Sequence, residues 1–83
     1  MLDKILGKIV SAEVVWRREQ LALEVVLKLA DGTSVADLTF EPEAVIKVMT
    51  DAKVVKVSDL PGKPIEASEG EPALSWRILT EVL

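Results

Sequence analysis

The chain has 83 residues, of which 49% are hydrophobic and 29% charged, and its net charge is −4. A chain of this size can enclose one hydrophobic core, so we expect a single domain over residues 1–83. The lack of Cys excludes a disulfide scaffold and thiolate chemistry, which fits a cytoplasmic location, and no apolar run is long enough to cross a membrane. The acidic balance disfavours general nucleic-acid binding.

The first half of the sequence predicts a three-stranded antiparallel meander. Residues 8–17, 21–29 and 33–40 alternate apolar and polar side chains with the period of two that is typical of strands. Residues 18–20 are short enough for a hairpin turn, and the Gly of Asp31-Gly32 tolerates the positive φ that tight turns require. The residues expected on the inner face are Val10, Ala12, Val14, Trp16, Leu21, Leu23, Val25, Leu27, Leu29, Ala36, Leu38 and Phe40.

The second half predicts a helix followed by two more strands. Pro42 suits the first turn of a helix, and the apolar residues after it have helical spacing. These residues are Val45, Val48, Met49 and Ala52. Residues 54–60 fit either a strand or a capped turn. Residues 63–67 predict a short strand, which Pro64 places at a sheet edge, and residues 73–83 predict the last strand, with Leu74, Trp76, Ile78 and Val82 on one face.

The resulting order, β-β-β-α-β-β, predicts an α+β fold in which a curved antiparallel sheet packs on one short helix. Several apolar residues are out of phase with the predicted core and give the sheet a second apolar face. They are Val15, Ala22, Val26, Leu79 and Leu83. Either the sheet curls into a small barrel or a partner covers this face, and a homo-oligomer with these residues at its interface is the more economical explanation.

No pattern in the sequence predicts catalysis. There is no His, so the commonest general base and metal ligand is missing, and the four glycines are too scattered for a phosphate-binding loop. The acidic residues lack the spacing of a calcium loop. We therefore expect a non-enzymatic protein with no cofactor and no metal site.

A repeated Trp-Arg dipeptide is the most suggestive pattern for ligand binding. Trp16 is followed by Arg17 and Arg18, and Trp76 is followed by Arg77. Tryptophan can stack on a base, and the guanidinium group is a planar donor for phosphate or carboxylate, so these residues could hold a small anionic, nucleotide-like ligand. The alternative is that both tryptophans belong to the core, because each is in phase with the apolar face of its strand.

Residues 56–83, KVSDLPGKPIEASEGEPALSWRILTEVL, resemble the C-terminal end of small uncharacterised bacteriophage and prophage proteins. The shared element is Leu60, Gly62, Pro64, Ile65 and Glu66, followed by Ser-Trp-Arg-Ile-Leu-Thr-Glu-Val-Leu at residues 75–83. Residues 6–13 are similar to the start of those proteins, whereas their aromatic, Gly-rich and Cys-containing middle is missing or replaced here. The resemblance covers about a third of the chain well and implies a phage-related origin, which favours binding over catalysis.

The function expected from the sequence is thus a phage-related binding module that acts as a homo-oligomer in the host cytoplasm. The first alternative is an antagonist of a host protein or defence complex, which would use the exposed apolar face or the acidic residues Glu66, Glu69 and Glu71. The second alternative is a structural component of a virion or of its assembly.

Overall fold

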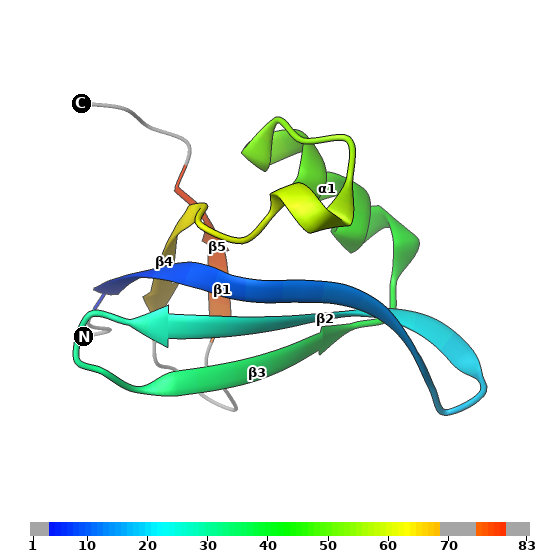
Figure 1. Ribbon diagram of the computed structural model, residues 1–83, viewed down its shortest axis with the longest axis horizontal. Helices are drawn as coiled ribbons and strands as arrows, with labels where there is room; N and C mark the ends of the chain where they lie inside the picture. Colours follow the sequence, from blue (N-terminus) through cyan, green and yellow to red (C-terminus); the bar gives the residue numbers. More distant parts are fainter. Residues whose placement is uncertain (1–3, 69–74, 80–83) are drawn as a thin grey trace.

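The computed structural model describes residues 4–68 and 75–79 of the chain. Five antiparallel strands form one curled sheet, a half-barrel with the order β3-β2-β1-β4-β5, and a helix packs against it (Figure 1). The strands are β1 (Lys4–Arg17), β2 (Gln20–Leu29), β3 (Ser34–Thr39), β4 (Pro64–Ser68) and β5 (Ser75–Ile78). The helices are α1 (Pro42–Ala52) and the short 3-10 helix η1 (Val57–Asp59). The predicted α+β fold is confirmed.

The strands follow a Greek-key path. The meander β1-β2-β3 is followed by a long connection through α1, after which β4 returns to lie beside β1. The spatial order 4-1-2-3 is the defining order of that motif. With β5 added, the connectivity is that of the five-stranded, partly open Greek-key barrel known as the OB fold. This path places β1 in the centre of the sheet, where it pairs with β2 on one side and with β4 on the other.

A β-bulge in β1 separates the part of the strand that pairs with β4 from the part that pairs with β2 alone. The register with β2 shifts between Ile9 and Ser11, so Ile9 lies in the core while Val10 is exposed. The expected core position of Val10 is therefore wrong, because the extra residue reverses the alternation of side chains. The turn at Gly62 and Lys63 holds the bulge, since the Gly62 N–H donates to Ile9 O at 2.6 Å and the Ile9 N–H donates to Lys63 O at 3.0 Å.

Strand β3 presents the opposite face from the one expected. Val35 pairs with Leu27 and Asp37 pairs with Val25, so Val35 and Asp37 lie on the core side of the sheet. The inner positions predicted for Ala36 and Leu38 are therefore wrong, because these two residues alternate with the core-facing ones and point outward. Phe40 follows the end of β3 and is half-buried. The apolar pattern was misleading because β3 carries apolar residues on both faces.

The remaining segments differ from expectation in smaller ways. Residues 54–60 contain η1 rather than a strand. Strand β4 is not an edge strand, because it pairs with both β1 and β5, and Pro64 is tolerated there as the first residue of the strand. The last strand is described only from Ser75 to Ile78, so the expected positions of Leu74, Val82 and Leu83 lie outside the described residues.

Two tight turns connect the meander. Arg18 and Glu19 both have positive φ, 51° and 61°, as a two-residue hairpin turn with right-handed strand twist requires. Gly32, with a φ of 92°, ends the second turn, where the Asp31 carboxylate accepts the Thr33 N–H at 2.9 Å. The hydrogen bonds from the Thr33 backbone and then its hydroxyl lower the pKa of Asp31.

The core lies between the concave face of the sheet and the helical connection. β2 supplies four of its buried residues, and Ala52 of α1 and Leu60 after η1 close it from the other side. The full set is Ile9, Leu23, Val25, Leu27, Leu29, Ala52, Leu60, Ile65, Ala67 and Ile78. The predicted inner face of residues 23–29 is confirmed, while Leu21 is exposed.

A side-chain hydrogen bond joins the two outermost strands of the sheet. The indole Nε1 of half-buried Trp76 on β5 donates to Oδ2 of Asp37 on β3 at 2.8 Å. The sheet has therefore curled far enough for its two edge strands, β3 and β5, to meet without backbone hydrogen bonds between them. We call this junction the seam.

Replacing Trp76 by Phe is expected to lower the free energy of unfolding by about 1–2 kcal/mol, because the charged Asp37 acceptor loses its donor in a partly buried place. Urea denaturation followed by far-UV circular dichroism measures this change. The matched control is Trp16→Phe, which removes an exposed indole and should alter stability by no more than about 0.5 kcal/mol. Equal losses in the two variants would show that the seam hydrogen bond is not stabilising.

Candidate functional site

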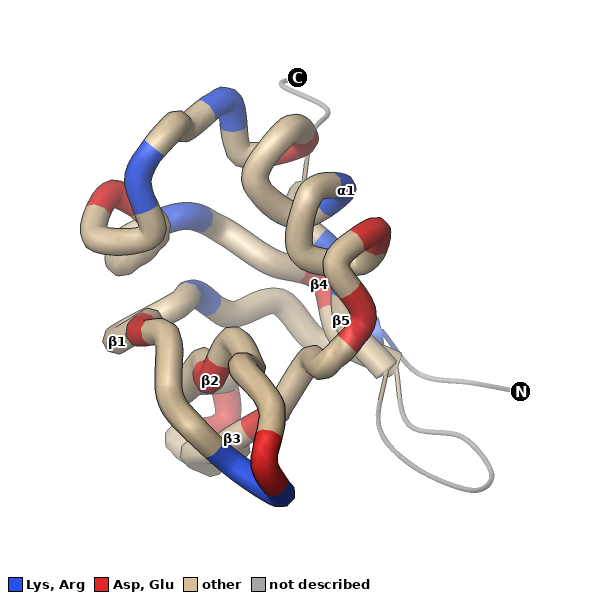
Figure 2. Tube along the Cα trace, turned by 90° about the vertical axis from the view of Figure 1, so that its right-hand side faces the viewer, with Lys and Arg blue, Asp and Glu red and all other residues tan. Residues whose placement is uncertain are grey.

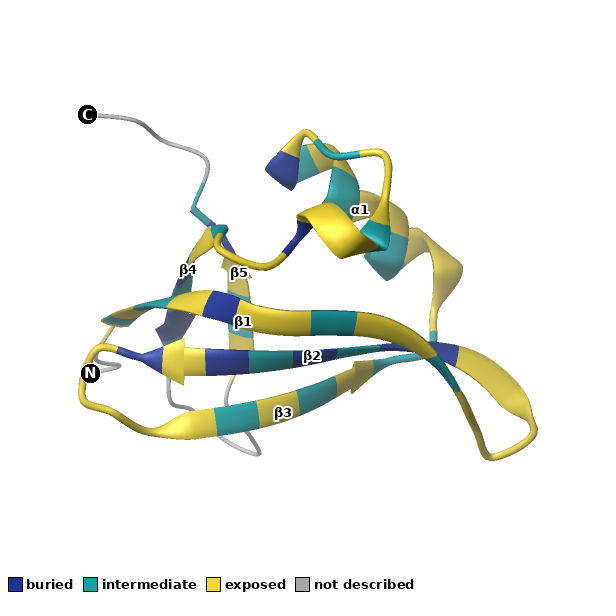
Figure 3. Cartoon of the chain, viewed as in Figure 1, coloured by how far each residue is buried: buried dark blue, intermediate teal, exposed yellow. Residues whose placement is uncertain are grey.

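The β1–β2 hairpin extends beyond α1 and leaves core-side residues uncovered. Val14, Trp16 and Leu21 share the face of the hairpin that continues from buried Leu23, yet their exposed fractions are 55%, 63% and 63%. Figure 3 shows the change from buried to exposed along the hairpin towards its tip. A small domain seldom leaves large apolar side chains grouped in this way without a partner.

Val14 and Leu21 border an apolar groove, which we call the hairpin groove. It lies between the hairpin and the start of α1, and its volume is about 300 Å³. Its lining is Val14, Leu21, Ala22, Leu23, Thr39, Phe40, Pro42, Val45 and Ile46. Thr39 contributes the only polar side chain among these lining residues. The side chain of Ile46 on α1 is 62% exposed, so both walls of the groove present accessible apolar surface.

The tip of the hairpin is charged and conformationally strained. Arg18 and Glu19 adopt a left-handed conformation that non-glycine residues seldom take and that favours Asn or Gly. The Arg18 guanidinium lies 6.0 Å from the centre of the Phe40 ring, which connects the tip to a residue that lines the groove. Figure 2 shows basic and acidic residues next to each other at this tip. Such strained turns concentrate at binding sites.

The second depression lies along the seam. Its volume is about 220 Å³, and its lining is Asp37, Thr39, Ala44, Lys47, Val48, Asp51, Trp76, Arg77 and Ile78. The charged groups at its rim are paired: Lys47 bonds to Asp51 at 3.1 Å, and Arg77 Nη2 lies 3.0 Å from Glu66 Oε1. Lys4 also approaches Glu66, at 3.7 Å. These pairings leave the seam depression with little free charge to attract a ligand.

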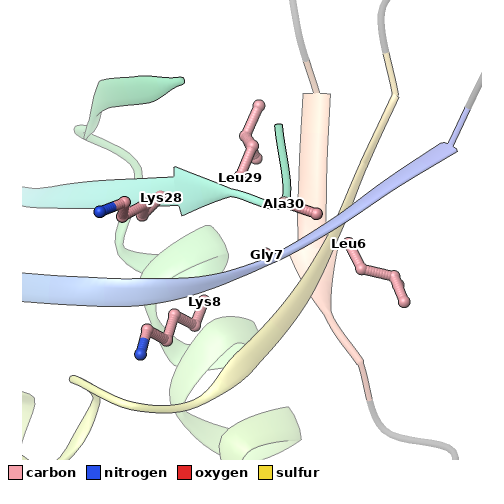
Figure 4. A pocket seen from close by; sticks show the side chains of 6 residues that line it. All are labelled: Leu6, Gly7, Lys8, Lys28, Leu29 and Ala30. Atoms are coloured by element: carbon pink, nitrogen blue, oxygen red, sulfur yellow. The ribbon is translucent and has the colours of Figure 1, made fainter. Parts of the chain in front are cut away.

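The third depression, of about 430 Å³, is shallow and lies on the outer face of β1 and β2. Its lining is Leu6, Gly7, Lys8, Lys28, Leu29 and Ala30. Lys8 and Lys28 are directly opposed across the two strands, and Figure 4 shows their side chains extending the same way. Directly opposed like charges on adjacent strands are unfavourable. An anion bound here would relieve that repulsion.

Replacing Lys28 by Glu should therefore raise the free energy of unfolding by about 0.5 kcal/mol, because a repulsive cross-strand pair becomes attractive. The gain should shrink as salt is added, and urea denaturation at low and high ionic strength measures both effects. Lys56→Glu makes the same change of net charge in an exposed connection and serves as the control. A gain of equal size in the control would assign the effect to net charge and not to the Lys8 contact.

The structure separates the residues of the predicted anion site. Trp16 and Arg17 lie at the free end of the β1–β2 hairpin, whereas Trp76 and Arg77 lie on β5, on the other side of β1 in the sheet order. Trp16 lies on the predicted face of its strand but is exposed, so it is not part of the core, while Trp76 packs against the core. Arg17 Nη2 lies 3.8 Å from Glu24 Oε2.

The predicted interface is brought together only in part. Val15 and Ala22 are a direct cross-strand pair on the outer face, and Val26 lies on the same face of β2. Leu79 is placed elsewhere, next to Pro64, whose C=O accepts the Leu79 N–H at 3.0 Å. Sequence reasoning missed Ile46, Leu21 and the Lys8–Lys28 pair. A helical projection could have placed Ile46 beside the Val45 stripe, but the other positions depend on strand register.

Within residues 4–68 and 75–79 no group of three or more acidic side chains is placed to hold a metal ion. Among these same residues no helix has the length and apolar character needed to span a bilayer. No protein-family model matches the chain, and no match was found among curated proteins or solved structures.

Proposed function

We propose that this protein is a non-enzymatic binding module whose hairpin groove receives an apolar segment of a partner protein. The observation that carries the proposal is the grouping of exposed Val14, Leu21 and Ile46 around one groove. A groove of this kind resembles the sites that accept a few apolar anchor side chains from a peptide or helix. Host proteins are partners consistent with the phage-related origin that the sequence suggests.

The chemistry of the groove favours a protein partner over a small polar ligand. Almost all of its lining is apolar, so binding would be driven by burial of hydrocarbon surface. Arg17, Arg18 and Glu19 at the hairpin tip would then supply a charged rim, which gives orientation and specificity at an interface. The OB-type connectivity does not decide the function, because one fold supports many activities.

The test uses a displayed library of random twelve-residue peptides selected on the immobilised protein. We expect enrichment of peptides with two or more large apolar residues, and we expect Ile46→Asp to weaken their binding at least tenfold, because a carboxylate would be desolvated in the groove. Val55→Asp is the matched control, since the Val55 side chain is 88% exposed and does not line the groove.

Two outcomes would overturn the proposal. The first is that the selection enriches no peptide. The second is that enriched peptides bind Ile46→Asp as well as they bind Val55→Asp. Circular dichroism spectra and unfolding midpoints of the three proteins must agree, so that lost binding is not caused by unfolding.

The small-anion hypothesis has less support from the arrangement of charges. Arg77 is engaged by Glu66, and the two tryptophans lie on different parts of the sheet. It stays a prediction with a direct test, in which Arg77→Ala abolishes binding of a nucleotide such as AMP without unfolding the protein. An AMP affinity that Arg77→Ala leaves unchanged would remove Arg77 from this hypothesis.

A further inference from the structure

Strand β1 has an unpaired edge along the hairpin. Its first part, Lys4–Lys8, pairs with β4, and Gly7 and Lys8 also pair with β2 on the other side, whereas beyond the bulge β1 pairs with β2 alone. In the described part of the chain, no other strand continues the ladder beside residues 11–17. A strand edge of this length normally attracts another strand unless the protein covers or blocks it.

The turn geometry identifies which backbone groups this edge presents. Arg17 and Gln20 flank a two-residue turn, so they form a hydrogen-bonded pair, and the bonds to β2 then alternate along the hairpin. The N–H and C=O groups of Ala12, Val14 and Trp16 therefore point away from β2. Among the described residues, these groups have one hydrogen bond, from Arg17 Nη1 to Trp16 O at 3.2 Å.

We infer that two copies of this chain join along these edges, with their β1 strands antiparallel about a two-fold axis at Val15. This register places Val14 opposite Trp16 of the second copy and lets both residues exchange backbone hydrogen bonds. It also pairs exposed apolar side chains, which a closed interface would remove from water. The two sheets then form one continuous sheet, and an isologous contact of this kind closes as a dimer.

Charge complementarity supports the second copy as the occupant. The register centred on Val15 places Glu13 of each copy directly opposite Arg17 of the other. Residues in these positions form non-hydrogen-bonded pairs, in which side chains approach most closely. The strand therefore has complementary charges at equal distances on either side of one residue, as self-pairing requires.

The dimer would also extend the hairpin groove. Trp16 of the second copy would lie beside Val14 and lengthen the apolar wall of the groove. The inference does not rest on the proposed function, because the edge is identified by its backbone groups and charges. The two proposals can also fail separately, since Ile46→Asp alters the groove without touching the edge of β1.

The experiment measures the dissociation constant of the dimer by sedimentation equilibrium. We expect a dimer for the natural sequence, and an approximately tenfold weaker one for Glu13→Arg or Arg17→Glu, because two attractive contacts become repulsive. The double variant carrying both changes should recover most of the affinity. Val14→Pro should give a monomer that stays folded, since the N–H that it removes points away from β2. Val55→Lys, at an exposed position in the connection after α1, should leave the dimer intact.

Hydrogen exchange identifies the surface that is used. In the dimer, the amides of Val14 and Trp16 should exchange slowly, and in Val14→Pro the Trp16 amide should exchange rapidly. A monomer at about 100 µM natural protein would overturn the inference, because it corresponds to a pairing too weak to matter for function. A dimer with rapidly exchanging Val14 and Trp16 amides would overturn it as well, and so would a double variant as weak as the single ones.

Discussion

Replacing Gly7 by Ala is expected to lower the free energy of unfolding by about 3 kcal/mol, a large part of the stability of a domain this small. A Cβ atom at this position would lie 2.6 Å from the backbone O of Lys28 and 3.1 Å from Cα of Leu29. Both are backbone atoms of β2, so no side-chain rotation can relieve the contact. The strands would have to separate where β1 turns from β2 towards β4, and urea denaturation measures the loss.

Gly32→Ala is the control for this substitution. Gly32 has a positive φ of 92°, but a methyl group placed on its Cα would have no heavy atom within 4 Å, so its replacement costs only backbone strain, about 1–2 kcal/mol. A loss at Gly7 no greater than the loss at Gly32 would contradict the close packing of β1 on β2. The comparison thus separates steric crowding from loss of backbone freedom.

Replacing Leu60 by Ala is expected to cost about 3 kcal/mol, because it removes a fully buried side chain and leaves a cavity. Leu60 follows η1 and comes directly before the turn whose Gly62 and Lys63 bond to Ile9. Its side chain therefore anchors the segment that holds the β1 bulge in place. The same denaturation experiment measures the loss.

Val55→Ala, in the same connection, is the matched control. Val55 is exposed, so its truncation should change stability by no more than about 0.5 kcal/mol. We also expect Leu60→Ala to speed hydrogen exchange of the Gly62 amide, because the turn loses its anchor while its hydrogen bond to Ile9 remains possible. A Leu60→Ala protein as stable as the control would show that this connection is not part of the core.

The sequence predicts the order of elements well because each one has a strong local pattern. The strict alternation of residues 21–29 identifies β2, and Pro42 with the apolar stripe behind it identifies α1. These patterns depend only on near neighbours in the chain. The curl of the sheet into a half-barrel was also expected as one of two ways to protect its second apolar face.

Which residues of a strand face the core was harder to predict than where the strands lie, because this depends on the register with the partner strands. Ile9 and Val10 are both apolar, so nothing in the sequence shows which one the bulge excludes from the core. On β3, Ala36 and Leu38 point outward, while Asp37 points inward and accepts a hydrogen bond from Trp76. A polar residue on an inner face becomes understandable only when its partner from the far end of the chain is known.

The candidate site shows the same limit. Trp16 and Trp76 stand in identical Trp-Arg pairs, yet one is exposed and the other half-buried. The difference arises because the β1–β2 hairpin is longer than the surface that α1 can cover. The local sequence around Trp16 does not show how far along the hairpin α1 will reach. The sequence therefore identified Trp16 as a candidate ligand-binding residue, without showing that Val14 and its cross-strand neighbour Leu21 border a groove completed by Ile46.

The seam hydrogen bond gives this protein an internal optical reporter. The indole of Trp76 is hydrogen-bonded to a carboxylate in a half-buried junction, whereas Trp16 is in contact with solvent. The two tryptophans therefore emit from different environments. In a Trp16→Phe background the emission comes from Trp76 alone, and a shift to longer wavelength reports separation of β3 from β5. Such a shift ahead of the loss of β-sheet circular dichroism would resolve opening of the barrel from global unfolding.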